Sequence, residues 1–429
     1  MSEVTRQAGV SAPPSQAAFV RQSLWLMIAN IGSGILFYLV HLLSKKISVA
    51  EYGAFGVMLA VAMCVPNLPL QMVFAQQTAR ALATGRERAL AGMIRLAWLG
   101  TLGLTLLLTA AVAIWHGHIL AAWKLPSEAG LWITLVVVLL CFWFPMFNGL
   151  LQGQQNFLWL GWANILNGIG RLSVAAVLVL VFTGASTEMI FGAAVGLAVG
   201  VGVGIWQTRT LWAVRSEPFD VRELLGQIVP LMLGFGAVQF LFTADTMFVK
   251  AYFSPDESGF YVGAGTLSRA LLWLVLPLAT VMFPKIVHST ARAEKSNLLG
   301  LVMVGTIVLG AGGAIGLTVL GPFAVKFAFT AEYVPVATHV LPWYAWAMVP
   351  LSLANVLVSN LLARLQFRIV PVLIVLAVAY GIALTQFHDS LVTVLKTLGI
   401  FNVLLLAACL FFTWLERGRE TPAADGGRG

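Results

Sequence analysis

The chain has 429 residues, of which 59% are hydrophobic and only 10% are charged. A soluble domain carries roughly 25% charged residues, so the composition excludes a soluble enzyme. At roughly 20 apolar residues for each membrane-spanning helix, the chain can form about twelve spans, and little remains for a domain outside the membrane. We therefore expect an all-α polytopic membrane protein.

The net charge of +8 is explained by topology, because basic residues collect in cytoplasmic loops. No basic run with interleaved aromatic residues lies outside the apolar stretches, so we expect no nucleic-acid partner. Cys64, Cys141 and Cys409 lie within apolar stretches and form no CxxC pair. No nucleotide-binding loop, nucleophile elbow or His-Glu-x-x-His motif occurs. We expect no enzymatic activity, no cofactor and no metal.

Polar tails are expected at residues 1–23 and 416–429. The first tail has no apolar core, so the first span itself must act as the targeting signal. Between the tails, the apolar stretches predict twelve spans, at 24–43, 53–75, 96–115, 131–150, 160–182, 189–208, 228–249, 260–284, 297–320, 341–362, 369–386 and 391–415. An even number of spans places both termini on the same side of the membrane.

The basic residues test this placement. With both termini in the cytoplasm, 17 of the 25 lysines and arginines fall on the cytoplasmic side and 6 on the outer side. Arg171 and Arg269 are the two that lie within spans, and all six on the outer side are lysines. A missed span would reverse the bias partway along the chain, and no reversal occurs.

Several short motifs recur at an offset of about 210 residues, as expected for two parallel structural repeats. Thr78-Ala79-Arg80-Ala81 recurs at 290–293, and Leu68-Pro69-Leu70 recurs at 276–278. We therefore expect two lobes of six spans around a central cavity. The N-lobe covers residues 24–208, a polar cytoplasmic linker covers 209–227, and the C-lobe covers 228–415.

Ionisable residues at membrane depth are the strongest functional signal, because an unpaired charge there is costly. Arg171, Asp245 and Arg269 lie within the fifth, seventh and eighth spans, and Lys250 lies at the outer end of the seventh. One interpretation is structural: Asp245 pairs with a basic residue and locks helices together. The other is that Arg171 and Arg269 bind an anionic head group, because a guanidinium matches phosphate bidentately. Asp245 is then either titratable or permanently paired.

Prolines give a second signal. Pro69 lies in the second span and Pro277 at the corresponding position of the eighth. Interrupted helices at matching positions often mark a transporter's binding site or gate, although a bend that is merely packed by its neighbours has the same sequence pattern. Four glycines spaced four apart, at 192, 196, 200 and 204, predict close helix packing in the sixth span.

The sequence resembles polysaccharide exporters of the O-antigen flippase type, within the multidrug/oligosaccharidyl-lipid/polysaccharide (MOP) superfamily. The resemblance covers nearly the whole chain and rests on loose motifs, at 30–32, 48–56, 152–157, 244–250, 259–264, 267–269 and 283–284.

This resemblance implies a transporter of the bacterial inner membrane that moves a lipid-linked oligosaccharide to the outer leaflet by alternating access. The carrier would often be undecaprenyl diphosphate, and partners would include polysaccharide polymerase or assembly proteins. Arg269, Arg171 and Lys250 become candidate head-group contacts, Asp245 a residue for charge coupling or pairing, and Pro69 and Pro277 gating bends. The chain departs from its relatives in having few charges within its spans.

Three other classes share parts of the pattern. A sugar or drug transporter of the major facilitator type has two lobes of six spans, but the loop at 83–88 has no Asp before it, as that family's motif would require. A multidrug exporter of the same superfamily needs more carboxylates in its cavity than Asp245 alone. A membrane subunit that anchors a synthesis complex without transporting anything would also fit the composition. Cation dependence would separate a drug exporter from a flippase.

Overall fold

The computed structural model describes residues 16–217, 219–291 and 298–420, and the regular structure in these residues is helical. The first half of the chain consists of α1 (Gln16–Leu39), the 3-10 helix η1 (Val40–Lys46), α2 (Val49–Met63), α3 (Asn67–Ala83), α4 (Glu87–Ala122), α5 (Glu128–Gly153), α6 (Phe157–Leu180) and α7 (Ser186–Gln207). A short helix, α8 (Arg209–Ala213), lies in the connection between the halves.

The second half repeats this long-helix architecture. It consists of α9 (Val221–Tyr252), α10 (Pro255–Ala291), α11 (Leu298–Val319), α12 (Gly321–Ala328), η2 (Ala331–Tyr333), α13 (Val334–Ala363), η3 (Phe367–Ile369), α14 (Val370–Gln386) and α15 (Leu391–Glu420). The short α12 and η2 lie between α11 and α13.

Eleven helical segments of the described residues are long and apolar enough to cross a membrane, with α2 and α3 together making one of them. The 37-residue helix α10 contains the remaining expected span, 260–284. The prediction of an all-α membrane protein with twelve spans in two lobes is thus confirmed. Within the expected polar linker, 209–227, α8 covers Arg209–Ala213 and α9 begins at Val221.

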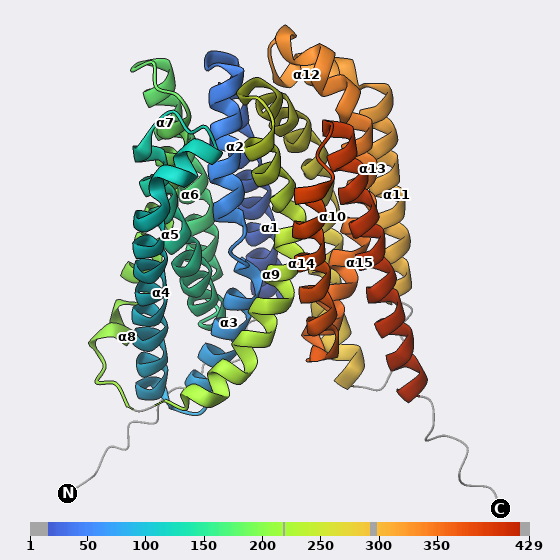
Figure 1. The fold of residues 1–429 in the computed structure, drawn as a ribbon. Helices are drawn as coiled ribbons and strands as arrows, with labels where there is room; N and C mark the ends of the chain where they lie inside the picture. The colour runs from blue at the N-terminus through green and yellow to red at the C-terminus, as the bar shows by residue number, and fades with distance from the viewer. Residues whose placement is uncertain (1–15, 218, 292–297, 421–429) are drawn as a thin grey trace, which may run out of the picture.

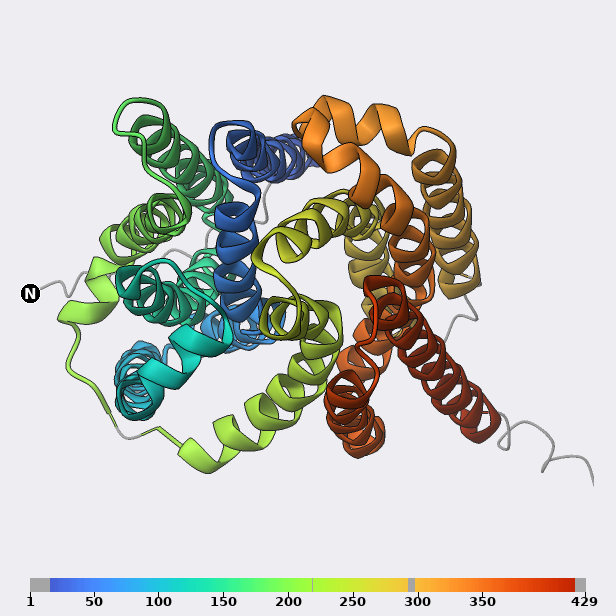
Figure 2. The same cartoon turned by 45° about the horizontal axis from the view of Figure 1, so that its top comes forward.

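The two halves stand side by side (Figure 1), with α1 to α7 on one side and α9 to α15 on the other. The long helices alternate in direction, so α1 begins and α15 ends at the same end of the bundle. We call this the terminal end, and we call the end where α2, α10 and η2 begin the far end. Seen with the far end tilted forward (Figure 2), α2 lies between the helices α4 to α7 and the helices α9 and α10.

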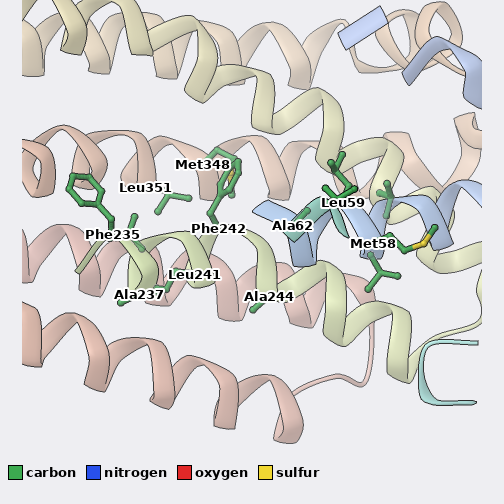
Figure 3. Close-up of a cluster of buried hydrophobic side chains, with 14 of the residues drawn as sticks. Met58, Leu59, Ala62, Phe235, Ala237, Leu241, Phe242, Ala244, Met348 and Leu351 are labelled. Carbon is green, nitrogen blue, oxygen red and sulfur yellow. The ribbon is translucent and has the colours of Figure 1, made fainter. Parts of the chain in front are cut away.

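The buried core runs through both halves, and α2 is the helix that joins them. Figure 3 shows buried side chains of α2, α9 and α13 that belong to one hydrophobic cluster: Met58, Leu59, Ala62, Phe235, Leu241, Phe242, Ala244, Met348 and Leu351. Outward faces carry large apolar side chains that remain exposed, as on α4 and α11. A lipid bilayer accepts such faces, so close packing rather than hydrophobic burial must hold the helices together.

The second span is broken in its middle. Helix α2 ends at Met63 and α3 begins at Asn67, with Pro66 in extended conformation between them (φ −76°, ψ 108°). Proline disfavours helical backbone in the residue before it, which explains the break. Pro69 lies in the first turn of α3, where proline is tolerated because no N–H is needed there. Helix α10, in contrast, continues unbroken past position 277, so a gating role for Pro69 and Pro277 stays a prediction.

Candidate functional site

Asp245 is the centre of a buried polar cluster in the second half. It lies on α9, seven residues before the helix ends, and it is completely buried. Arg269 of α10 donates from Nη2 to Asp245 Oδ1 at 2.8 Å and to Oδ2 at 3.0 Å. The hydroxyls of Tyr261 (2.9 Å) and Tyr344 also donate to Oδ2. The carboxylate therefore accepts hydrogen bonds from three side chains, which come from two other helices, α10 and α13.

The Arg269 guanidinium is held on several sides as well. Its Nε donates to the carbonyl of Phe242 at 3.2 Å, and its Nη2 donates to Thr246 Oγ1 at 2.8 Å. The guanidinium also lies over the rings of Phe242 and Tyr344, 5.2 and 5.4 Å from their centroids. With 14% of its side chain exposed, Arg269 is neutralised by Asp245 and fixed between α9, α10 and α13.

A reciprocal cap fixes the hairpin that brings these helices together. Glu257 N donates to Ser254 Oγ at 3.3 Å, and the Ser254 N donates back to Glu257 Oε2 at 3.0 Å. This capping box satisfies free amides at the first turn of α10. It sets where α10 starts, and therefore which of its residues face α9.

Arg171 occupies a different environment in the first half. It lies on α6, is only 7% exposed, and its guanidinium stacks on the Phe37 ring of α1 at 4.4 Å. Its Nε has no hydrogen-bond partner, and no ion pair to it is formed within the part of the chain that the structure describes. Gly196 of α7 faces its backbone, since a Cβ there would lie 2.7 Å from Arg171 N. The predicted close packing of this helix is thereby confirmed.

Aromatic and polar side chains occupy the space between the two arginines. The Phe37 ring that supports Arg171 also packs against Trp273 of α10, 6.1 Å between centroids. Beside it, His41 Nδ1 hydrogen-bonds the Tyr52 hydroxyl at 2.8 Å, and this hydroxyl contacts Thr266 Oγ1 of α10 at 3.1 Å. The two halves therefore meet next to both arginines.

Lys250 lies apart from the arginines. Its side chain is 1% exposed at the far end of α9, and its Nζ approaches the carbonyl of Ala50, at the start of α2, at 3.5 Å. Of the four charged residues singled out from the sequence, the structure brings Asp245 and Arg269 into contact. It leaves Arg171 in the other half and Lys250 where α9 meets α2.

Sequence reasoning missed the tyrosines that complete the Asp245 cluster. Tyr261 lies within a segment that carries the family resemblance and so had a signal. Tyr344 had none, because it comes from α13, 99 residues away along the chain. Among the described residues, no group of three or more His, Cys, Asp and Glu side chains is arranged to hold a metal ion.

Comparison with known proteins supports this picture. The family model described as polysaccharide biosynthesis protein matches residues 19–289. The chain belongs to this family. A search of curated protein sequences returns no match.

Solved structures show the same fold at low sequence identity. A multidrug resistance MATE family transporter of the MOP superfamily, in an inward-facing conformation, aligns with TM-score 0.71 and 10% identity, over 94% of this chain and 99% of its own. The lipid II flippase MurJ, in an inward closed conformation, aligns with TM-score 0.67 and 15% identity, over 92% of this chain and 87% of its own.

A MOP superfamily transporter from Pyrococcus furiosus aligns with TM-score 0.63 and 11% identity, over 94% of this chain and 96% of its own. The chain is thus a multi-pass membrane protein of the polysaccharide biosynthesis family, and it shares its fold with these transporters.

Proposed function

We propose that this protein moves a lipid-linked oligosaccharide between membrane leaflets, and that Arg171 binds the phosphate groups of its lipid carrier. Undecaprenyl diphosphate is the carrier that fits the family best. Membership of the polysaccharide biosynthesis family and the fold shared with a lipid II flippase support this substrate class. The process changes no covalent bond, so no catalytic residues are needed.

The single observation that carries the proposal is the unpaired charge of Arg171. A guanidinium stays charged in a protein, and burying it without a counter-ion is costly. Arg269 meets this cost with Asp245, whereas Arg171 has only the face of Phe37. A phosphate group would supply the missing acceptors, because a guanidinium donates to two phosphate oxygens in parallel. Arg171 therefore has free donors, and Arg269 has already used most of its own.

The same comparison supports a structural role for Asp245. A cationic drug would need a free carboxylate at membrane depth, and Asp245 is already occupied by one guanidinium and two hydroxyls. This arrangement favours an anionic substrate over a cationic one.

The distribution of charge supports one orientation in the membrane. Lys45, Lys124 and Lys250 lie at the far end, whereas arginines such as Arg80 and Arg86 lie at the terminal end. Following the positive-inside rule, the terminal end faces the cytoplasm of a bacterial inner membrane. The substrate is then loaded from the cytoplasmic leaflet and released at the far end, where polymerase or assembly proteins would receive it.

The test measures which leaflet holds the lipid-linked sugar in cells depleted of this protein and then supplied with a variant. Arg171→Met should abolish translocation without lowering thermal stability, since it removes a buried charge that has no partner. Arg171→Lys should retain part of the activity, because it keeps the charge and loses the bidentate geometry. Arg209→Gln is the matched control: Arg209 also stacks on an aromatic ring, Trp206, but at the protein surface.

Normal leaflet distribution in depleted cells would refute the substrate class, and efflux of a cationic dye would then be measured next. Normal distribution with Arg171→Met, together with trapping in depleted cells, would refute only the role of Arg171.

A further inference from the structure

Three lysines at the far end each donate a hydrogen bond to a backbone carbonyl of the opposite half. Lys45 Nζ donates to Phe327 O at 2.6 Å, and Lys124 Nζ donates to Phe253 O at 2.6 Å. In the reverse direction, Lys250 Nζ of the second half contacts Ala50 O of the first at 3.5 Å. The three bonds thus join the halves at three places around one end of the bundle.

Two of the acceptors are carbonyls at helix ends. Phe327 is in the last turn of α12, and Phe253 directly follows the last residue of α9. Carbonyls at a helix C-terminus lack intrahelical donors and carry the negative end of the helix dipole. An ammonium group is therefore a suitable partner for both. Lys45 additionally lies over the Phe327 ring, 5.9 Å from its centroid.

Lys124 also has an uncommon backbone conformation. Lys124 has φ 47°, in the left-handed region that glycine adopts most readily. A residue with a Cβ is disfavoured there by about 1–2 kcal/mol. The chain nevertheless has a lysine where it leaves α4, and this side chain makes a bond to the other half.

Close backbone packing accompanies the three bonds. Gly53 and Gly56 of α2 face α10 so closely that a Cβ at either would overlap Ser258 or Val262. Gly259 of α10 lies in the same way against the carbonyl of Val49. Helices α2 and α10 therefore seal the far end, and the lysines bond around this contact.

The terminal end is joined differently. The bonds described there involve α9 and the connection that leads into it. Gln77 Nε2 donates to Gln227 Oε1 at 3.2 Å, Arg88 pairs with Glu217 at 3.2 Å, and Arg95 Nη2 donates to the carbonyls of Trp212 and Val214 at 2.6 and 2.8 Å. All three lysine bonds lie at the far end.

We propose that Lys45, Lys124 and Lys250 form a latch that holds the far end closed and that opens in each transport cycle. Lys45 and Lys124 are exposed, so water replaces their acceptors at little cost and each bond is weak enough to break repeatedly. Lys250 is buried in the closed state and gains hydration when the halves separate. The latch therefore favours the closed state by little free energy, so that the far end can open again. It depends on no particular substrate.

The experiment measures the separation of the halves at the far end by pulsed electron resonance in lipid nanodiscs. Spin labels are placed at His118 of α4 and Asp389 of the α14–α15 loop, both exposed and outside the latch, in a background whose three native cysteines are replaced by alanine. Lys45→Gln or Lys124→Gln should raise the ratio of open to closed molecules about two- to fivefold each. When these two substitutions are combined with Lys250→Met, their effects on the ratio of open to closed molecules should multiply.

Two variants separate the latch from folding and from net charge. Lys124→Gly removes the side chain and relieves the left-handed backbone, so it should raise thermal stability while favouring the open state. Lys46→Gln removes a neighbouring exposed charge for which the described residues of the other half offer no hydrogen bond, and its distances should equal those of the wild type. A triple variant with the wild-type distance distribution would overturn the proposal. So would an equally large change from Lys46→Gln.

Discussion

Asp245→Asn should destabilise the fold strongly, because it leaves Arg269 as an uncompensated charge. Asp245 is fully buried and accepts hydrogen bonds from Arg269, Tyr261 and Tyr344. Breaking a buried ion pair by removing one partner costs about 3–5 kcal/mol. The Arg269 side chain is 14% exposed and can recruit some water, which places the expected loss near the lower end, about 3 kcal/mol. The two hydroxyls lose a charged acceptor as well, which adds about 1 kcal/mol.

The assay is the free energy of unfolding in mixtures of SDS and a mild detergent, for the single variants and for Asp245→Asn combined with Arg269→Met. The double variant removes both charges, so it should recover more than half of the loss and give a coupling energy of at least about 2 kcal/mol. Asp389→Asn, an exposed carboxylate of the same half, is the matched control and should have no measurable effect. Additive single variants would refute the argument, as would a loss below 1 kcal/mol for Asp245→Asn, a threshold well under the range for buried pairs.

Two further predictions concern packing and the connection between the halves. Gly196→Ala should lower the unfolding free energy, because a Cβ there meets Arg171 N at 2.7 Å. Gly202→Ala, on the same helix, places its Cβ in open space and should raise the unfolding free energy by up to about 1 kcal/mol. Equal effects of the two substitutions would contradict the packing argument. Arg95 donates at 2.6 and 2.8 Å to two carbonyls of the connection between α7 and α9. Arg95→Gln should therefore speed tryptic cleavage at Arg215, and the exposed Arg86→Gln should not; equal cleavage rates for the two would argue against the anchor.

The sequence predicted the membrane architecture well because that architecture depends on local hydropathy. A run of about 20 apolar residues must form a helix in lipid, whatever its neighbours are. The proline break was also local: Pro66 disfavours helix in the residue before it, and α2 ends at Met63. The same rule would predict a break before Pro277, but α10 is continuous there. Neighbouring helices can satisfy the backbone around a proline, which a sequence does not show.

The charged residues mark the limit of sequence reasoning. Asp245, Arg171, Arg269 and Lys250 were identified as costly side chains, and Asp245 had three basic candidates for its partner. Which of them pairs with Asp245 depends on how α9 and α10 are rotated about their axes and on the packing of α13, which places Tyr344 against the carboxylate. In the structure, Arg269 is the partner. Lys250 lies five residues beyond Asp245 and contacts α2 instead.

By itself, the sequence determined that this protein folds in a membrane, how many spans it has, and which few charged residues within the spans need a partner. These follow from each residue's own cost of transfer between water and lipid. The tertiary structure decided which charges neutralise one another, which arginine keeps its donors free, and that lysines bond across one end of the bundle. Such pairings depend on contacts between helices up to 282 residues apart in sequence, and no local property of the chain specifies them.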